Sequence, residues 1–195
     1  MNQEVGPKTL CELRKYIRQD VDFTSEKPQS LLKRYLIEAG AKYTFWLRVT
    51  RYLFLKGKIA FLPFLAARLI LKHYGYKYSF DISYRAQIAG GLQIAHYGYI
   101  IVPSSTTMGE YCRLRPGVVI GTKFTRNEKH GVIIGDGVEF GVGAKVLGDI
   151  TIGDNVIIGA NAVVLENVPD NCIVAGVPAK ITRTFEDVSN VTKMR

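Results

Sequence analysis

The chain has 195 residues, 47% of them hydrophobic and 22% charged, a composition typical of a globular protein with one or two domains. Its three cysteines form no CxxC or Cys/His cluster, which argues against a disulfide framework or a zinc site and favours a reducing compartment. The first residues lack the apolar core of a signal peptide, and the longest apolar run, residues 59–71, is too short to cross a bilayer. We therefore expect a cytoplasmic protein.

The formal charge of +9 lies entirely in the first 80 residues, which hold 15 Lys/Arg and 6 Asp/Glu, whereas residues 81–195 hold 11 of each. Such a basic excess can indicate nucleic acid, a membrane surface or an anionic ligand. Zinc-finger, basic-zipper and RNA-binding aromatic motifs are absent, so no nucleic-acid partner is predicted. A solvated basic helical face is the simplest interpretation, and peripheral association with a membrane surface or attraction of an anionic substrate is the alternative.

The first 79 residues predict an α-helical N-terminal region. Residues 8–22 place Leu10, Leu13, Ile17 and Val21 on one helical face. Residues 30–78 predict one or more further helices, punctuated by Gly57 and ended by Gly75, with a surface histidine at His73. The candidates for the core of this block are Leu32, Tyr35, Leu36, Phe45, Trp46, Val49, Leu53 and Leu55.

After Phe80 the pattern changes, because large apolar residues recur at every sixth position. The series comprises Ile82, Ile88, Ile94, Ile100, Met108, Leu114, Ile120, Ile134, Phe140, Val146, Ile152, Ile158 and Val164, with insertions after Ile100 and Ile120. Glycines often follow these residues, which is incompatible with a helix. A six-residue period predicts a triangular solenoid in which each hexapeptide forms one flat face and three complete a coil. We expect it to span residues 80–182, capped at one end by the helices, with a C-terminal tail at 183–195.

Three segments resemble the hexapeptide acyltransferases, specifically the serine acetyltransferase branch. They are LRKYIRQDVD near the N-terminus, FDISYRAQIAGGLQIAHYGYIIV from Phe80, and FGVGAKVLGDITIGDNVIIGANAVVLENVPDNCIVAGVPAKI from Phe140. The chain is equally similar to the small acetyltransferases of surface-polysaccharide pathways. The resemblance implies a mainly β, left-handed parallel β-helix and homotrimers with sites between subunits. It also implies acetyl-CoA as co-substrate and no metal.

Carried over onto this sequence, the resemblance places the catalytic base at His96 and its carboxylate partner at Asp81, fifteen residues earlier. The chemistry is reasonable, since a histidine near its working pKa can take a hydroxyl proton as the oxygen attacks a thioester. An aspartate on the other ring nitrogen fixes the tautomer and stabilises the imidazolium. The alternative interpretation is a structural histidine.

The same resemblance implies two groups of binding residues. The acceptor would meet His130 and Lys129 in the polar loop after Ile120, together with Tyr97 and Tyr99 beside His96; an exposed loop histidine is the alternative for His130. The pantetheine arm of acetyl-CoA would contact backbone groups near Gly121, Thr122, Val142 and Ala160, and its phosphates would contact Lys145 and Lys180. The small residues among them can equally serve as tight corners of a coil.

Ala95 decides the predicted acceptor. Serine acetyltransferases carry an acidic residue immediately before the catalytic histidine, where it holds the amino group of serine, and here that residue is Ala95. Losing a hydrogen bond to a charged amine costs about 1.5–3 kcal/mol. With Tyr97 and Tyr99 nearby, we predict a sugar hydroxyl of a capsular or other surface polysaccharide as the acceptor, with L-serine of cysteine biosynthesis as the alternative.

Two other classes of protein share the predicted solenoid. A γ-type carbonic anhydrase needs three histidines around zinc, whereas only His96 and His130 fall in the predicted β-helix. A non-catalytic scaffold would keep the hexapeptides but would not need the Asp81/His96 pair. Acetyl-CoA-dependent O-acetyl transfer is therefore the predicted activity.

Overall fold

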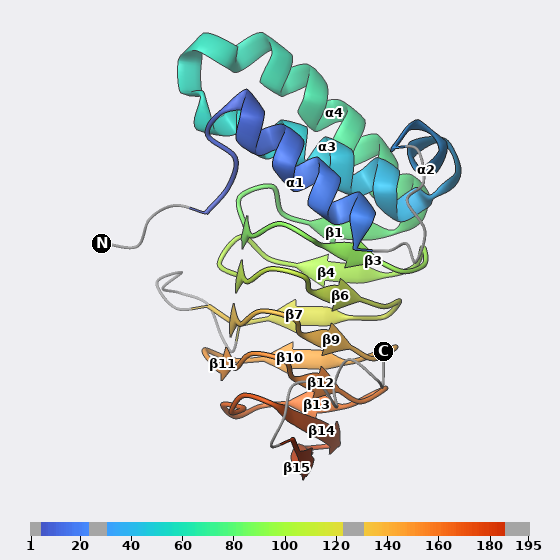
Figure 1. The fold of residues 1–195 in the computed structure, drawn as a ribbon, viewed down its shortest axis with the longest axis vertical. Coiled ribbons are helices and arrows are strands. Elements are labelled where there is room, and N and C mark those ends of the chain that lie inside the picture. The colour runs from blue at the N-terminus through green and yellow to red at the C-terminus, as the bar shows by residue number, and fades with distance from the viewer. Residues whose placement is uncertain (1–4, 24–30, 123–130, 186–195) are drawn as a thin grey trace.

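The computed structural model describes residues 5–23, 31–122 and 131–185. In Figure 1 a helical layer lies across one end of a column of stacked strands. The helices come first along the chain, and the strands follow without returning to the helical layer. The helical elements are α1 (Leu10–Asp22), α2 (Leu31–Ile37), α3 (Ala39–Leu55), a 3₁₀ helix (Gly57–Ala60) and α4 (Phe61–Tyr78).

α1 is an amphipathic helix with a complete capping box. The Thr9 side chain accepts from the N–H of Glu12, and the Glu12 side chain accepts from the N–H of Thr9, which satisfies two free donors of the first turn. Leu13 and Val21 are buried as predicted, but Leu10 is 61% exposed. The buried stripe therefore begins one turn later than the sequence pattern predicted.

α3 buries polar side chains where apolar ones were predicted. Several of the predicted core residues are only half-buried, and Leu36 on α2 is 60% exposed. The buried face of α3 includes Tyr43, Leu47, Arg48 and Arg51. The reason is that this face meets backbone carbonyls of the first coil, so it must supply hydrogen-bond donors as well as apolar contact.

α4 continues through Gly75, which was predicted to end the helical block, and stops at Tyr78. Gly75 has a different role. A Cβ there would lie 2.8 Å from the carbonyl oxygen of Phe80, so the helix can approach the first strand this closely only with glycine. No helix among the described residues is long and apolar enough to cross a membrane.

The strands form a parallel β-helix, which confirms the predicted fold class. Three sheets make its faces, in the orders β1-β4-β7-β10-β13, β11-β8-β5-β2 and β15-β14-β12-β9-β6-β3, here called sheets A, B and C. The last strand, β15, differs, because it runs antiparallel to β14. The strands are β1 (Phe80–Ile82), β2 (Gln87–Ile88), β3 (Gln93–Ile94), β4 (Ile100–Val102), β5 (Thr107–Met108), β6 (Arg113–Leu114), β7 (Val119–Gly121), β8 (Ile133–Ile134), β9 (Glu139–Phe140), β10 (Lys145–Leu147), β11 (Thr151–Ile152), β12 (Ile157–Ile158), β13 (Val163–Val164), β14 (Cys172–Gly176) and β15 (Ala179–Thr184).

All thirteen residues of the six-residue series are buried, with exposed fractions of 7% or less. The pairing register corrects one detail of the prediction. Val102, and not Ile100, lies opposite Ile82, while Ile100 lies opposite Phe80. The inward residue after Ile94 is therefore Val102, and the first insertion lies between these two residues and not after Ile100. It lengthens the corner that contains His96.

The helical layer and the β-helix share one hydrophobic core. Tyr43 and Leu47 of α3 and Leu71 of α4 belong to the same buried cluster as the inward residues of the coils. Arg48 of α3 forms a bidentate ion pair with Asp20 of α1, with N–O distances of 2.9 and 3.0 Å. Arg48 also donates to the carbonyls of Ile88 and Ala89, both at 2.6 Å. This arrangement joins two helices to the first coil.

Candidate active site

Asp81 projects outward from the first strand of sheet A. The strand alternates, so Phe80 and Ile82 point to the core while Asp81 is exposed. Tyr43 of α3 fixes this strand from behind, because its hydroxyl accepts from the N–H of Ile82 and donates to its carbonyl, both at 3.2 Å. Burial raises the pKa of Tyr43 well above its usual value, so the phenol stays neutral and able to donate.

His96 lies in the lengthened corner between β3 and β4. Ile94 before the corner and Ile100 after it are buried, whereas His96 is exposed, so the imidazole points away from the core in this chain. The corner continues through Gly98, whose φ of +145° favours glycine, and a Cβ there would lie 3.0 Å from Cβ of Pro116 in the next coil. The backbone after His96 is thus held closely against its neighbour.

Backbone hydrogen bonds bring the His96 corner alongside the start of β1. The N–H groups of Gly98 and Ile100 donate to the carbonyls of Tyr78 and Ser79, each at 3.1 Å. Asp81 itself lies opposite Ile101. Within the described part of the chain, no hydrogen bond or ion pair joins the Asp81 and His96 side chains.

A hollow of about 590 Å³ lies between α4 and the first coil, with Asp81 and Tyr99 in its wall. α4 contributes Arg68 and Lys72, so two cations share this hollow with the Asp81 carboxylate. The Arg68 guanidinium lies 5.8 Å from the ring centroid of Tyr84, a further wall residue. Sequence reasoning missed Arg68 and Lys72 because they lie far from the hexapeptide region, although their four-residue spacing puts them on one helical face.

The two tyrosines predicted to meet the acceptor differ in position. Tyr97 is 73% exposed and Tyr99 is 57% exposed, and both flank Gly98 in the His96 corner. Tyr99 is the one that lines the hollow beside Asp81. The other two predicted acceptor residues, Lys129 and His130, lie outside the described residues.

The positions predicted for acetyl-CoA are spread over sheet A and its two borders. Val142 and Ala160 occupy equivalent corners before β10 and β13, in successive coils, where the N–H of Asn161 donates to the carbonyl of Val142 at 2.8 Å. Gly121 ends β7 and is followed by Thr122 on the opposite border of the sheet. Within one chain, these corners therefore lie on opposite borders of sheet A and do not form a single binding site.

The two lysines predicted for the phosphates are engaged within the chain. Lys145 lies on the outer side of β10, and its Nζ donates to the carbonyl of Gly143 at 2.9 Å. Lys180, on β15, lies 3.4 Å from Glu166, with both side chains largely exposed. An exposed ion pair of this kind is weak and can exchange its partner for a phosphate.

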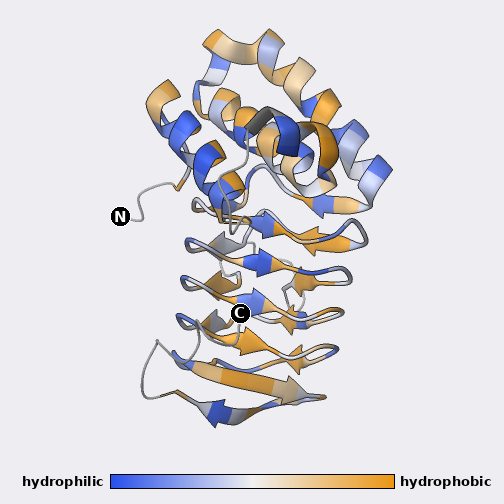
Figure 2. Ribbon diagram, turned by 45° about the vertical axis from the view of Figure 1, so that its right-hand side comes forward, coloured by the Kyte–Doolittle hydropathy of each residue, from blue (hydrophilic) through white to orange (hydrophobic). Residues whose placement is uncertain are grey.

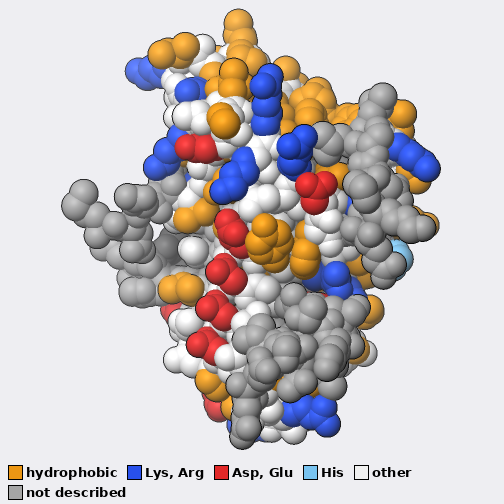
Figure 3. Space-filling model, viewed as in Figure 1, with side chains coloured by type: hydrophobic (Ala, Val, Ile, Leu, Met, Phe, Trp, Pro, Cys, Tyr) orange, Lys and Arg blue, Asp and Glu red, His pale blue; other side chains and the backbone are white. Residues whose placement is uncertain are grey.

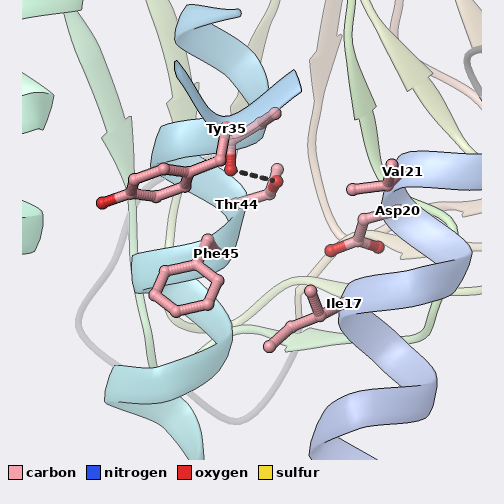
Figure 4. Close-up of a pocket in the computed structure, with 7 residues that line it drawn as sticks. Ile17, Asp20, Val21, Tyr35, Thr44 and Phe45 are labelled. Atoms are coloured by element: carbon pink, nitrogen blue, oxygen red, sulfur yellow. Dashed lines mark hydrogen bonds between the residues drawn. The ribbon is translucent and has the colours of Figure 1, made fainter. Parts of the chain in front are cut away.

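A second hollow, of about 430 Å³, lies among α1, α2 and α3 (Figure 4). Ile17, Val21 and Phe45 make it apolar, and Tyr35 closes one side. Asp20 also faces it, but its carboxylate is already bonded to Arg48 and to the N–H of Leu92. This hollow contains none of the predicted site residues.

Comparison with known proteins identifies the family. Residues 131–166 match the family described as bacterial transferase hexapeptide (six repeats). The serine acetyltransferase of Staphylococcus xylosus is 32% identical over 178 residues, which cover 89% of this chain and 80% of that enzyme. The chain belongs to the serine acetyltransferase family. Family membership confirms the resemblance inferred from the sequence.

Several curated serine acetyltransferases match this chain over only part of their own length. The enzyme of Synechococcus elongatus is 38% identical over 96 residues, which cover 49% of this chain and 39% of the enzyme. The chain likewise spans about half the length of several other curated relatives. Among solved structures, the Neisseria gonorrhoeae serine acetyltransferase superposes with a TM-score of 0.77 at 26% identity, covering 94% of this chain and 70% of that one.

Proposed function

We propose that the protein is an acetyl-CoA-dependent O-acetyltransferase that acetylates the hydroxyl of L-serine. The observation that carries the proposal is the relationship to the S. xylosus serine acetyltransferase over most of both chains. The comparisons give no support to the sugar acceptor predicted from Ala95, and they favour the alternative, serine. The exposed His96, and the exposed Asp81 in the wall of a charged hollow, support the same class of chemistry.

In the proposed mechanism, His96 is the general base. It takes the proton of the acceptor hydroxyl as the oxygen attacks the thioester carbonyl carbon of acetyl-CoA. The tetrahedral intermediate then expels the CoA thiolate, which takes the proton from His96. The products are the O-acetyl ester and free CoA, and no acyl-enzyme forms.

Asp81 would orient His96 and stabilise its imidazolium. The two exposed side chains must turn toward one another for this, since no hydrogen bond joins them in the described structure. Such rotation is compatible with their exposure and with catalytic hydrogen bonds that tighten only when substrate binds. Tyr43 would contribute by holding the strand that carries Asp81.

For acetyl-CoA, we propose a groove that runs along sheet A. Backbone groups at Gly121, Thr122, Val142 and Ala160 would bond the amides of the pantetheine arm. The phosphates would meet Lys145 and Lys180. Because these positions are spread over sheet A, its borders and β15 of sheet C, a second subunit would complete the groove, as in the proposed homotrimer. His130 and Lys129 would approach the acceptor from the loop after β7.

The deciding experiment measures CoA release with a thiol reagent, with L-serine and with neutral and acidic oligosaccharides as acceptors. We expect turnover with serine and a loss of about 10²–10⁴-fold in kcat for His96→Ala. His73→Ala is the matched control, because His73 is also exposed but lies on α4. If His96→Ala retains wild-type kcat, the proposed mechanism is wrong.

A sugar hydroxyl is the second candidate acceptor, and specific observations favour it. Ala95 offers no charge for a serine ammonium, and Tyr97 and Tyr99 present exposed aromatic rings beside His96. Arg68 and Lys72 would suit an acidic sugar in the adjacent hollow. Turnover with an oligosaccharide and none with serine would replace the serine proposal while keeping the His96 mechanism.

A further inference from the structure

The outward side of α4 is unusually apolar. Ile59 of the preceding 3₁₀ helix is 98% exposed, and Leu62, Leu65, Leu69 and Tyr76 follow along the helix with exposed fractions from 41% to 75%. These five residues are here called the outer face of α4. Leu62, Leu69 and Tyr76 recur every seven residues, so they share one side of the helix.

α4 is therefore apolar on two sides. Ala67, Leu71 and Gly75 form its buried side against the rest of the protein. A helix that is apolar all round is normally buried on all sides, and large exposed apolar surfaces mark interaction sites. Figure 2 shows hydrophobic residues along both the helices and the strands, whereas Figure 3 shows hydrophobic side chains gathered on the surface of the helical end, which is the end away from β15.

The charges carried by α3, the 3₁₀ helix and α4 are all positive, and an acidic residue, Asp81, lies across the hollow that Lys72 and Tyr76 also line. Residues 39–80 contain eight Lys/Arg and no Asp or Glu. Lys58, Lys72 and Lys77 are exposed on or beside α4, and Lys72 lies 5.4 Å from the ring centroid of Tyr76. An apolar stripe flanked by basic residues and an aromatic ring is the pattern of a helix that lies flat in a membrane interface.

We propose that the outer face of α4 binds the surface of an anionic lipid bilayer, with the leucines in the acyl boundary and the lysines at the headgroups. The helix would lie on the membrane without spanning it, since no helix in the described part of the chain is long and apolar enough to cross a bilayer. The basic composition of the first 80 residues left peripheral membrane association as an alternative. In this proposal the association is assigned to the outer face of α4.

Two other occupants fit this face less well. A second copy packed face to face would oppose the same lysines with no acidic residue between 39 and 80 to compensate them. Nucleic acid would satisfy the lysines, but its phosphate backbone offers nothing to Leu62 or Leu69. Anionic lipid matches both the charge and the apolar stripe.

The experiment is co-sedimentation of the full chain with phosphatidylcholine vesicles, with or without about 30 mol% phosphatidylglycerol. We expect binding to the anionic vesicles, weakened at about 0.5 M salt. Leu69→Asp should reduce binding about tenfold or more, because it places a carboxylate in the stripe. Ile181→Asp is the matched control, since Ile181 is also half exposed, on β15 at the opposite end.

A second variant tests insertion directly. Leu69→Trp keeps the face apolar, so binding should persist and the added fluorescence should shift to shorter wavelength on vesicles. The proposal fails if anionic vesicles bind no better than neutral ones or if Leu69→Asp binds like wild type. It also fails if Leu69→Asp changes only the oligomeric state, which would assign the face to contacts between copies. The proposal also fails if the protein binds double-stranded DNA as well as it binds anionic vesicles and Leu69→Asp does not change this binding. That result would mean that the protein binds polyanions in general.

Discussion

At the scale of single residues, the position of His96 depends on the glycine two residues after it. The corner between β3 and β4 contains two more residues than a regular hexapeptide turn, and Gly98 lets this longer corner lie flat against the next coil. Its N–H donates to Tyr78, and the N–H of Gly117 donates to the carbonyl of Tyr99. The placement of the proposed base is therefore fixed by backbone conformation and by backbone hydrogen bonds.

Replacing Gly98 with alanine should both destabilise the protein and lower kcat. The positive φ and the contact with Pro116 together predict a cost of about 1–3 kcal/mol in the free energy of unfolding. Urea unfolding and the acetyltransferase assay measure the two effects. Gly57→Ala is the control, because Gly57 also has positive φ but a Cβ there would meet nothing within 4 Å. Equal unfolding costs for the two variants, with unchanged kcat, would contradict the role given to Gly98.

At the scale of elements, the Asp20–Arg48 pair determines how the helices sit on the β-helix. Both side chains are at most 3% exposed. Their hydrogen bonds to Leu92, Ile88 and Ala89 satisfy backbone groups of the first coil that would otherwise be buried without partners. Since α1, α3 and the coil all contribute, the pair acts as a three-way junction.

Asp20→Ala should therefore be among the most damaging single changes in the helical region. It leaves a buried guanidinium without its carboxylate, and we expect a loss of about 3–5 kcal/mol in the free energy of unfolding. The comparison is Glu166→Ala, which removes the exposed pair with Lys180 and should cost about 0–1 kcal/mol. Similar costs for both variants would show that the junction contributes little.

At the scale of the whole molecule, the shared core implies that helices and β-helix unfold together. Tyr43 lies in this core and contacts Phe80 edge-on at 5.1 Å between ring centroids. It joins the two parts through Ile82 as well. Ionisation of one phenol at this junction therefore affects the stability of the entire chain.

This arrangement predicts a loss of stability in alkali. Burial raises the folded-state pKa of Tyr43 above its ordinary value of 10.0, so above that pH the unfolded chain releases a proton that the folded chain retains. Stability contributed by the neutral phenol is complete below pH 10 and should fall by about 1.4 kcal/mol for each further pH unit.

Urea midpoints measured from about pH 8 to about pH 11 test this prediction. Tyr43→Phe should be less stable at neutral pH, because Ile82 loses its partner, but less sensitive to alkali. Tyr97→Phe, which removes an exposed hydroxyl, is the control. A wild-type profile that stays flat up to the highest pH would exclude Tyr43 as the alkaline determinant.

The β-helix was predictable because its fold is encoded in local spacing. Each inward residue, such as Ile152 or Ile158, is specified six positions from the last, so the periodicity shows the core directly. The insertion at the His96 corner was placed wrongly because spacing alone does not tell which of Ile100 and Val102 stacks on Ile82. Only the pairing register does.

The helical region was harder to predict, since its burial depends on what it packs against. α3 buries Arg48 because carbonyls of the first coil, 40 residues away in sequence, need donors. Asp81 and His96 were predicted as a pair from the resemblance to serine acetyltransferases, and the fold places them in neighbouring segments. Arg68 and Lys72 were missed, because their approach to Asp81 depends on how α4 lies across the first coil.

The antiparallel β15 also limits how this protein can assemble. An exposed edge of stacked parallel strands is a template on which another chain can continue the ladder, leading to fibres. Here β15 occupies that edge beside β14, reverses the strand direction and adds Lys180 and Arg183. At the other end, α3 and α4 cover the first coil. Continuation of the parallel ladder by another copy is thus blocked on sheet C, and the proposed trimer would form through the flanks of the column, where the His96 corner lies.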